Sequence, residues 1–230
     1  MPAMSWTLPV ARWSCWSSHP ESTPEVAFVD PMMRRRLSSL SRMALQVADD
    51  CVDARTKARV VFGSRHGELR RTTEILSGIE AGKPVSPNAF SLSVLNAMTG
   101  LFGISRQDRS AATAVSAGAQ TLGYALLEAY AQWSEDAAGP VLMVYADEAA
   151  DARYGEIEHE VRRGAFALLI EAGAASQGEL ACTVAQDARG GERRFDTQSE
   201  ALQHCLSSGE QAVWRGNGVT WQWSWHAGTA

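Results

Sequence analysis

The stretch that decides the fold is Ser110-Ala-Ala-Thr-Ala-Val-Ser-Ala-Gly-Ala-Gln-Thr-Leu-Gly-Tyr-Ala-Leu-Leu-Glu-Ala-Tyr130. Small and β-branched residues lead up to Val115, and small residues follow it directly. An apolar series at helical spacing comes next, made of Leu122, Ala125, Leu126, Ala129, Tyr130 and Trp133. The pattern predicts a buried strand, an abrupt turn, and a helix that packs against a sheet.

The turn in this stretch is the candidate functional site, because the first amides of the helix would point at whatever lies there. If the corner residue is Val115, its side chain supplies no chemistry. If it is Ser116, the frame Ala114-Val-Ser-Ala-Gly118 approaches the Gly-x-Ser-x-Gly nucleophile elbow. Ala114 then stands where the first glycine belongs. The residues themselves leave both interpretations open.

Composition and charge limit the classes of protein to consider. An apolar content of 45% with 20% charged residues is typical of a soluble globular protein, and 230 residues without a linker predict one domain, 1–230. The net charge of −5 argues against non-specific nucleic-acid binding, which needs a basic surface. The first residues lack a secretory pattern and no long apolar run exists, so we expect a cytoplasmic protein without a membrane span.

The sequence predicts neither a metal site nor a cofactor. The four cysteines, Cys15, Cys51, Cys182 and Cys205, form no Cys-x-x-Cys pair and are expected to be buried free thiols. The segment 156–160 has one histidine and no second one four residues away, which favours a charged loop. Asp147, Glu148 and Asp151 follow an apolar strand pattern. A solvated loop is favoured for them over a metal site or an acid–base pair.

Alternating strand and helix patterns predict an α/β fold. We expect a mixed, mostly parallel five-stranded sheet with helices on both faces. Its strands are expected at 59–63, 109–115, 140–146, 165–170 and 180–184. The last two should pair antiparallel, because few residues separate them. Residues 5–18 are expected to add one or two short edge strands, because Pro9 disfavours a central position.

Three further helices and a hairpin complete the expectation. Asp30 and Pro31 open an amphipathic helix of about five turns that reaches Cys51. A second helix is expected to begin at Glu68. The side chains on its expected core-facing side are Leu69, Thr72, Ile75, Leu76 and Ile79. Thr197-Gln-Ser-Glu200 matches a capping box, and Asn217-Gly218 predicts a hairpin whose Trp221, Trp223 and Trp225 pack on the core.

Several segments together resemble the β-ketoacyl synthases, a family of thiolase fold. Thr113-Ala-Val-Ser-Ala-Gly-Ala-Gln120 resembles the Thr-Ala-Cys-Ser-Ser-Gly nucleophile corner, and 86–101 resembles the segment before that strand. The strand 141–148 and the helix 30–45 are similar to the family's next core strand and its arginine-rich helix. The resemblance covers roughly 26–170, the N-terminal half of the family fold, with 195–230 as an extension.

The resemblance implies a protein that lacks its own catalysis. The family's cysteine falls on Val115, and a valine cannot form an acyl-enzyme. The family's two histidines lie in the other half of its fold, and neither His204 nor His226 stands in a recognisable motif of the family.

A ketosynthase-like protein without its cysteine resembles a chain-length factor, and one of this length is similar to those of aryl polyene pathways. This implies a heterodimer with an active β-ketoacyl synthase, which works on chains held by acyl carrier protein. The resemblance places the dimer strand at Ser110, Ala112, Ala114 and Val115. Phe90 and Met98 are candidates for lining the acyl tunnel.

Two other functions remain as alternatives. One is a serine hydrolase or acyltransferase in which Ser116 is the nucleophile and the following helix supplies an oxyanion hole. The other is a shortened catalytic ketosynthase that uses a displaced thiol, Cys182 or Cys205. Neither of these thiols lies at a predicted strand–helix corner.

Overall fold

The computed structural model describes residues 3–17, 23–137, 139–173, 176–186 and 195–228. One eight-stranded sheet has the order β3-β2-β4-β5-β1-β6-β8-β7. The strands are β1 Met4–Ser17, β2 Arg59–Gly63, β3 Ala112–Val115, β4 Val141–Asp147, β5 Gly164–Ile170, β6 Gly178–Gln186, β7 Ala212–Gly216 and β8 Val219–Ala227. The α/β fold class predicted from the sequence is confirmed.

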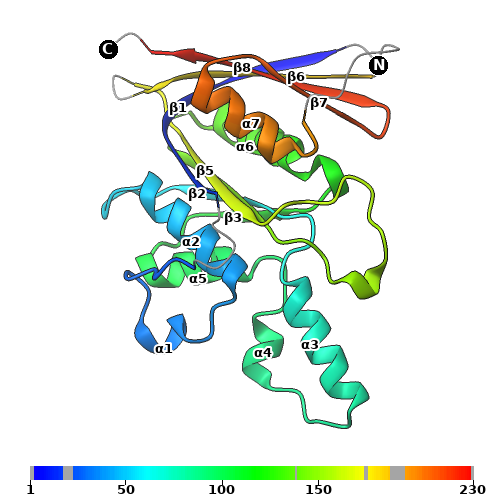
Figure 1. Ribbon diagram of the computed structural model, residues 1–230. Coiled ribbons are helices and arrows are strands. Elements are labelled where there is room, and N and C mark those ends of the chain that lie inside the picture. Colours follow the sequence, from blue (N-terminus) through cyan, green and yellow to red (C-terminus); the bar gives the residue numbers. More distant parts are fainter. Residues whose placement is uncertain (1–2, 18–22, 138, 174–175, 187–194, 229–230) are drawn as a thin grey trace.

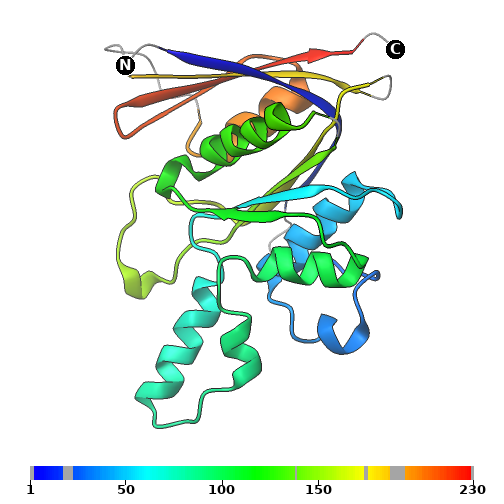
Figure 2. The same ribbon diagram turned by 180° about the vertical axis from the view of Figure 1, so that it is seen from behind.

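The helices divide between the two faces of this sheet. They are α1 Pro31–Arg34, α2 Ser39–Cys51, α3 Leu69–Glu80, α4 Pro87–Ser91, α5 Ala97–Arg106, α6 Thr121–Glu135 and α7 Gln198–Ser208, with short 3₁₀ turns η1 Gly118–Gln120 and η2 Ala152–Tyr154. Figure 1 shows the sheet folding back on itself, so that α6 and α7 lie between its two halves. In the view from behind, α2 and α5 cover the other face of the half that contains β3 (Figure 2). No described helix is both long and apolar enough to cross a lipid bilayer.

Alternating residues of the central strands fill two separate cores. In β4, Val141, Met143 and Tyr145 point toward α6 and α7. Their neighbours Leu142 and Val144 point toward α2 and α5. This is the period of two that a strand requires, and burial of both faces explains why β4 reads as an uninterrupted apolar run.

The N-terminal segment differs from its prediction as a short edge strand, because β1 is the long strand that joins the two halves of the sheet. Its first part, from Met4 to Val10, pairs with β6, and its second part, from Val10 to Ser17, pairs with β5. The register shifts between Val10 and Arg12 at the crossing point. Pro9 is tolerated inside the strand because the ladder with β5 begins only after it.

The number of strands and their directions also differ from the prediction. Only β2 makes parallel pairs, with β3 and with β4, and the other five pairings are antiparallel. Strands β5 and β6 were expected to pair with each other, but β1 lies between them. A short connection between two strands does not exclude the insertion of a third strand from elsewhere in the chain.

Local signals in the sequence located the caps and the hairpin well. Asp30 accepts hydrogen bonds from the amides of Met32 and Met33, and Thr197 forms the predicted capping box with Glu200. The turn at 217–218 joins β7 to β8 with both residues at positive φ. Trp221 and Trp223 are fully buried and Trp225 is partly buried, so the hairpin packs on the core as predicted.

Two helix predictions need correction. The expected five-turn helix is split into α1 and α2, because the Ser38 side chain accepts a hydrogen bond from the Ser41 amide and begins a new helix. The expected inward face of α3 is not inward: Leu76 is 55% exposed and Ile79 is 52% exposed. In the part of the chain that the structure describes, no strand or helix of the sheet region covers that face, since α3 and α4 extend away from the sheet as a pair (Figure 1).

Candidate functional site

The candidate site is the corner between β3 and α6, at the carboxyl end of the parallel strands. The strand ends at Val115, Ser116 is exposed, and Gly118 has φ +57° where the chain turns into the helix. The amide of Ser64 donates to the carbonyl of Val115 over 3.1 Å, which fixes the corner to the loop after β2. The predicted succession of strand, abrupt turn and helix is confirmed. The strand was expected to be buried, and that part was wrong, because β3 is an edge strand with exposed and half-buried residues.

Two glycines let α6 approach the strands closely. A Cβ on Gly63 at the end of β2 would lie 2.9 Å from the Cβ of Ala125. A Cβ on Gly123 would lie 2.5 Å from the indole ring of Trp221 in β8. The helix is therefore packed between β2 on one side and β8 on the other, and this contact sets the position of the corner.

Two amides near the start of α6 are already paired within the chain. The amide of Ala117 donates to Thr121 Oγ1 over 2.9 Å. The amide of Gly123 donates to Gln198 Oε1 of α7 over 2.8 Å. In an elbow of the Gly-x-Ser-x-Gly kind the amide after the nucleophile belongs to the oxyanion hole. Here that amide belongs to Ala117, and its donor is occupied by Thr121.

Ser116 is hydrogen-bonded in a way that does not activate its hydroxyl. Its Oγ donates to the main-chain carbonyl of Arg65 over 3.0 Å. A nucleophilic serine needs a base within hydrogen-bond reach. The histidine next to Arg65 in the sequence is His66, and its Nε2 is paired with Glu160 Oε1 over 2.8 Å. The described residues therefore do not bring Ser116 and a histidine together as a catalytic pair.

A buried carboxylate, Asp147, holds the loop after β2 beside the corner. Its oxygens accept from Ser64 Oγ over 2.8 Å, from the Arg65 amide over 2.8 Å and from the His66 amide over 3.0 Å. The hydroxyl of Tyr145 also donates to it. Burial raises the pKa of Asp147, and these hydrogen bonds oppose the rise. The prediction of a solvated carboxylate at this position was wrong, because Asp147 has no exposed surface.

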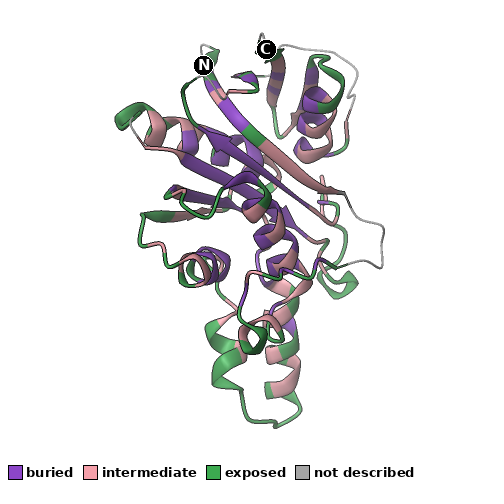
Figure 3. Cartoon of the chain, turned by 90° about the vertical axis from the view of Figure 1, so that its left-hand side faces the viewer, coloured by how far each residue is buried: buried purple, intermediate pink, exposed green. Residues whose placement is uncertain are grey.

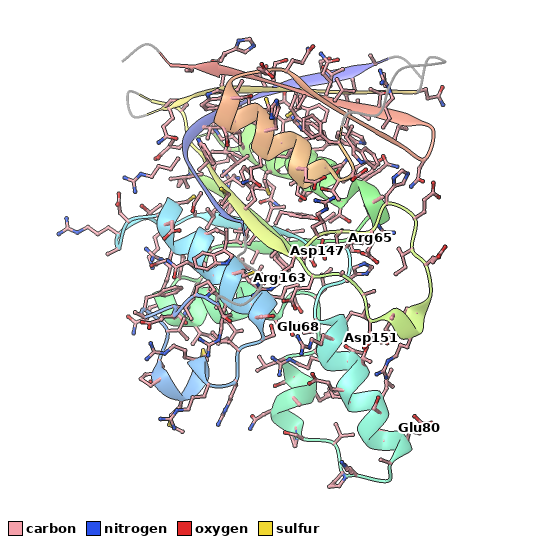
Figure 4. All side chains as sticks on the ribbon, viewed as in Figure 1. Arg65, Glu68, Glu80, Asp147, Asp151 and Arg163 are labelled. Atoms are coloured by element: carbon pink, nitrogen blue, oxygen red, sulfur yellow. The ribbon has the colours of Figure 1, made fainter. Side chains whose placement is uncertain are left out.

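Hydrogen bonds hold the loop after β4 over the same end of the sheet. The Arg65 guanidinium donates to the carbonyl of His159 over 2.5 Å and to that of Glu158 over 3.1 Å. The imidazole of His159 packs edge-on against the Trp214 ring, with 5.4 Å between the ring centroids. Figure 4 shows Arg65 and Asp147 near each other above the base of α3, where Glu68 lies. The segment predicted as a charged loop therefore closes around the loop after β2.

Beside the corner, β3 forms one edge of the sheet. The carbonyl of Ala111 accepts a hydrogen bond from Val60 in β2, and that of Val115 from Ser64 just after β2, so the peptide groups of Ala112 and Ala114 face away from β2 toward the free edge. Ser110 precedes the strand and hydrogen-bonds Asp108 Oδ1 through both its amide and its hydroxyl. An open groove of about 540 Å³ runs along α6 next to this edge. It is lined by Val115, Ala117, Tyr124, Leu127, Glu128 and Ala131.

The remaining candidate residues lie apart from the corner. Met98, on the buried face of α5, is 1% exposed, whereas Phe90 on α4 is 64% exposed. Cys182 and Cys205 are buried in the core around α6 and α7, and all four thiols are free. Burial raises the pKa of the Cys205 thiol to about 11 and that of Cys182 further, so neither is a thiolate near neutral pH.

Sequence reasoning missed the network around Asp147, Arg65 and Glu160. Asp147 ends β4, Arg65 follows β2 and Glu160 precedes β5, so three separate segments bring them together. A carboxylate directly after an uninterrupted apolar strand was the available signal, since that position lies at the end of a buried parallel strand.

The chain matches the family model described as "Beta-ketoacyl synthase, N-terminal domain" over residues 13–224. A comparison with curated protein sequences gives no match. Among solved structures, this chain is similar to a chain in the complex of the ketosynthase ApeO with its chain length factor ApeC, from Xenorhabdus doucetiae. The identity is 25% and the TM-score 0.77, over 95% of this chain and 99% of that one.

Two longer proteins share the fold at lower identity. The ishigamide ketosynthase/chain length factor matches at 19% identity and a TM-score of 0.58, over 73% of this chain and 54% of that one. A β-ketoacyl synthase from Burkholderia phymatum STM815 matches at 14% identity and a TM-score of 0.54, over 81% of this chain and 56% of that one. The chain thus spans about half the length of these two proteins and nearly all of the chain from the ApeO–ApeC complex.

The family model covers most of the sequence, and the solved relatives carry the same thiolase-like arrangement of sheet and helices. The chain belongs to the β-ketoacyl synthase N-terminal domain family.

Proposed function

We propose that this protein is a non-catalytic chain-length factor that pairs with an active β-ketoacyl synthase. The observation that carries the proposal is the corner at Val115, where the family resemblance expects the nucleophilic cysteine. Support also comes from the match in length to the chain from the ApeO–ApeC complex, of which 99% is covered.

The local geometry around the corner supports a role without catalysis. Val115 offers no nucleophile, and the hydroxyl of Ser116 is committed to a main-chain carbonyl. The amide of Ala117, which would stabilise an oxyanion, is committed to Thr121. Without a nucleophile, and with the amide of Ala117 already paired, the corner lacks two of the groups that acyl transfer needs.

The edge of β3 is the proposed contact with the ketosynthase. Its outward peptide groups at Ala112 and Ala114 are available for pairing with a strand of another subunit. The groove along α6 places the apolar side chains of Val115, Tyr124 and Leu127 beside that edge. Strand pairing would fix the register of the two subunits, and the groove would add apolar contact area.

The proposed product is a polyene chain of the aryl polyene kind, carried to the complex by acyl carrier protein in the cytoplasm. The exposed ring of Phe90 is the residue of this chain that we propose as tunnel lining. Met98 lies on the buried face of α5 and would act on tunnel width through the position of that helix.

Co-expression with the ketosynthase encoded nearest in the same genome tests the proposal. We expect native mass measurement of the purified material to give a 1:1 complex. Ala112→Pro, which removes an outward amide, should weaken the complex, and Ala112→Val, which keeps it, should not. If the wild-type chain never elutes with a ketosynthase, the proposal is wrong.

A further inference from the structure

A cluster of aromatic rings joins the core of the protein to its surface. Its members come from β1, α6 and β8, and they are Trp6, Tyr124, Tyr130, Trp221 and Trp223. The ring of Trp221 lies at the centre, with 5.3 Å between its centroid and that of Tyr124. Its centroid lies 6.0 Å from that of Trp6 and 6.3 Å from that of Trp223. The Trp6 ring lies 6.3 Å from that of Tyr130. These are the separations of rings in contact, and we call the five residues the ring cluster.

The ring cluster runs from full burial to contact with water. Trp221 and Trp223 have no exposed surface, and Trp6 is 5% exposed. These three belong to the buried interior, which Figure 3 draws in purple. Tyr124 is 41% exposed in the groove along α6, and Tyr130 is half-buried. The cluster therefore has a buried centre of tryptophans and a tyrosine at each outer end.

The buried tryptophans face no base that would take a proton from them. An indole that has lost one electron is a radical cation, and its N–H is far more acidic than that of indole itself. Among the described residues, Trp6 Nε1 and Trp223 Nε1 have no hydrogen-bond partner. Trp221 Nε1 donates to the side-chain oxygen of Gln120 over 3.0 Å, and an amide oxygen is a poor base. A positive charge formed on these rings therefore stays there, where burial makes it costly.

Tyr124 is the ring of the cluster whose environment lets it lose a proton to water. When its ring gives an electron to the oxidised Trp221 ring, the phenol proton passes to solvent and a neutral phenoxyl radical remains on Tyr124. Trp221 is restored by the same electron. The transfer is favourable because a neutral phenoxyl is a weaker oxidant than a tryptophan radical cation. A soluble thiol then returns a hydrogen atom to the phenoxyl oxygen and is left as a thiyl radical.

The packing around Trp221 leaves no room for an oxidised ring. A Cβ added to Gly123 would lie 2.5 to 2.6 Å from three atoms of this ring, so an oxygen atom added on that side would overpack the contact. Oxidation in place would also bury a new polar group. Passing the missing electron on to Tyr124 therefore protects the contact between α6 and β8 that positions the corner.

We infer that the ring cluster is a route for one-electron oxidation, and that Tyr124 is the site where oxidation of the buried tryptophans reaches solvent. The oxidant that it requires is an excited or radical species that takes one electron from an indole. Tyr124 is the exit, and not Tyr130, because it is the more exposed of the two and contacts the central ring directly. The inference is independent of the proposed function and concerns the unpaired chain, in which the groove along α6 is open.

Photoionisation of tryptophan in the isolated full-length chain tests the inference. Ultraviolet light at the long-wavelength edge of the indole band excites tryptophan and spares tyrosine, and hexaamminecobalt(III) removes the ejected electron. We expect the absorbance of the tryptophan radical to decay while that of a tyrosyl radical grows, at a rate independent of protein concentration. Tyr124→Phe should remove most of the tyrosyl signal and lengthen the life of the tryptophan radical. Tyr154→Phe is the matched control, because Tyr154 is 42% exposed and outside the ring cluster, and it should change neither signal.

Peptide mapping after continuous illumination in air gives a second readout. We expect more oxygen on the tryptophans of the ring cluster in Tyr124→Phe than in the wild type or in Tyr154→Phe. An unchanged thermal midpoint in both variants shows that the effect does not come from unfolding. A tyrosyl signal in Tyr124→Phe equal to that of the wild type would overturn the assignment of the exit, as would its loss in Tyr130→Phe alone. Tryptophan radicals that decay without any tyrosyl signal would overturn the route itself.

Discussion

At the scale of single residues, the absence of a side chain can matter as much as its chemistry. Gly123 is buried inside α6, where alanine would normally favour the helix by about 1 kcal/mol. A Cβ at this position would meet three atoms of the Trp221 ring at 2.5 to 2.6 Å. The close approach of α6 to β8, which positions the corner, therefore depends on a glycine.

We predict that Gly123→Ala destabilises the protein by about 1–3 kcal/mol, because overpacking against the fixed ring outweighs the gain in helix propensity. The measurement is the midpoint of urea unfolding. Gly78→Ala in α3 is the control, since a Cβ there meets no atom within 4 Å, and this change should leave the midpoint unchanged or raise it. A Gly123→Ala protein as stable as the wild type would contradict the packing described for α6.

The cysteines give a second prediction at this scale, which addresses a displaced catalytic thiol. Burial raises the pKa of Cys51 to about 12 and of Cys205 to about 11, and it also raises the pKa values of Cys15 and Cys182. Since the thiolate is the reactive form, a raised pKa lowers reactivity at a given pH.

At pH 8 we therefore expect the folded chain to react slowly with a thiol-specific disulfide reagent, and to react at all four thiols within minutes in denaturant. Stopped or manual mixing with absorbance detection measures both rates. A single thiol that reacts in the folded state as fast as a free cysteine would support a catalytic role for it.

At the scale of elements, the loops after β2 and β4 depend on one carboxylate. Asp147 accepts from two amides and from the hydroxyls of Ser64 and Tyr145. Replacing it by asparagine puts an amide donor where only acceptors fit, so at least one buried donor would lose its partner.

We predict that Asp147→Asn costs about 1–3 kcal/mol of stability and increases amide hydrogen exchange in residues 64–67. Asp151→Asn makes the same chemical change on the next loop at a side chain that is 49% exposed, and it should cost much less. Equal stability of the two variants would show that the Asp147 network does not hold the loop.

Local signals made some elements predictable, and distant contacts decided the others. The capping box at Thr197 and the turn at Asn217 lie within a few residues of the structure they specify, and both were predicted. The position of β1 depends on β5 and β6, whose partner residues lie about 150 to 180 positions away, so its spacing alone indicated only a strand. The outward turn of α3 depends on the absence of a covering element, which helical periodicity does not report.

The candidate site shows the same division. The corner itself was predicted, because strand, turn and helix follow one another in a single stretch. The pairing of Ser116 with Arg65 and of Ala117 with Thr121 was not, since hydrogen-bond partners at the corner depend on how the loops meet. Those pairings support the proposal that Ser116 is not a nucleophile, and they leave the role of Val115 to be tested.

At the scale of the whole molecule, the two halves of the sheet enclose α6 and α7 and leave one open edge at β3. In the proposed heterodimer this edge would be covered. Under that proposal the chemistry takes place in the partner subunit, and the interface between the two chains shapes the product.

The most direct test is the intact mass of each chain after the purified complex has been incubated with acyl-loaded acyl carrier protein. We predict that the ketosynthase chain gains the mass of one acyl group and that this chain keeps its own mass. An acyl adduct on this chain, at Ser116 or at any cysteine, would contradict the central claim that its corner takes no part in the chemistry.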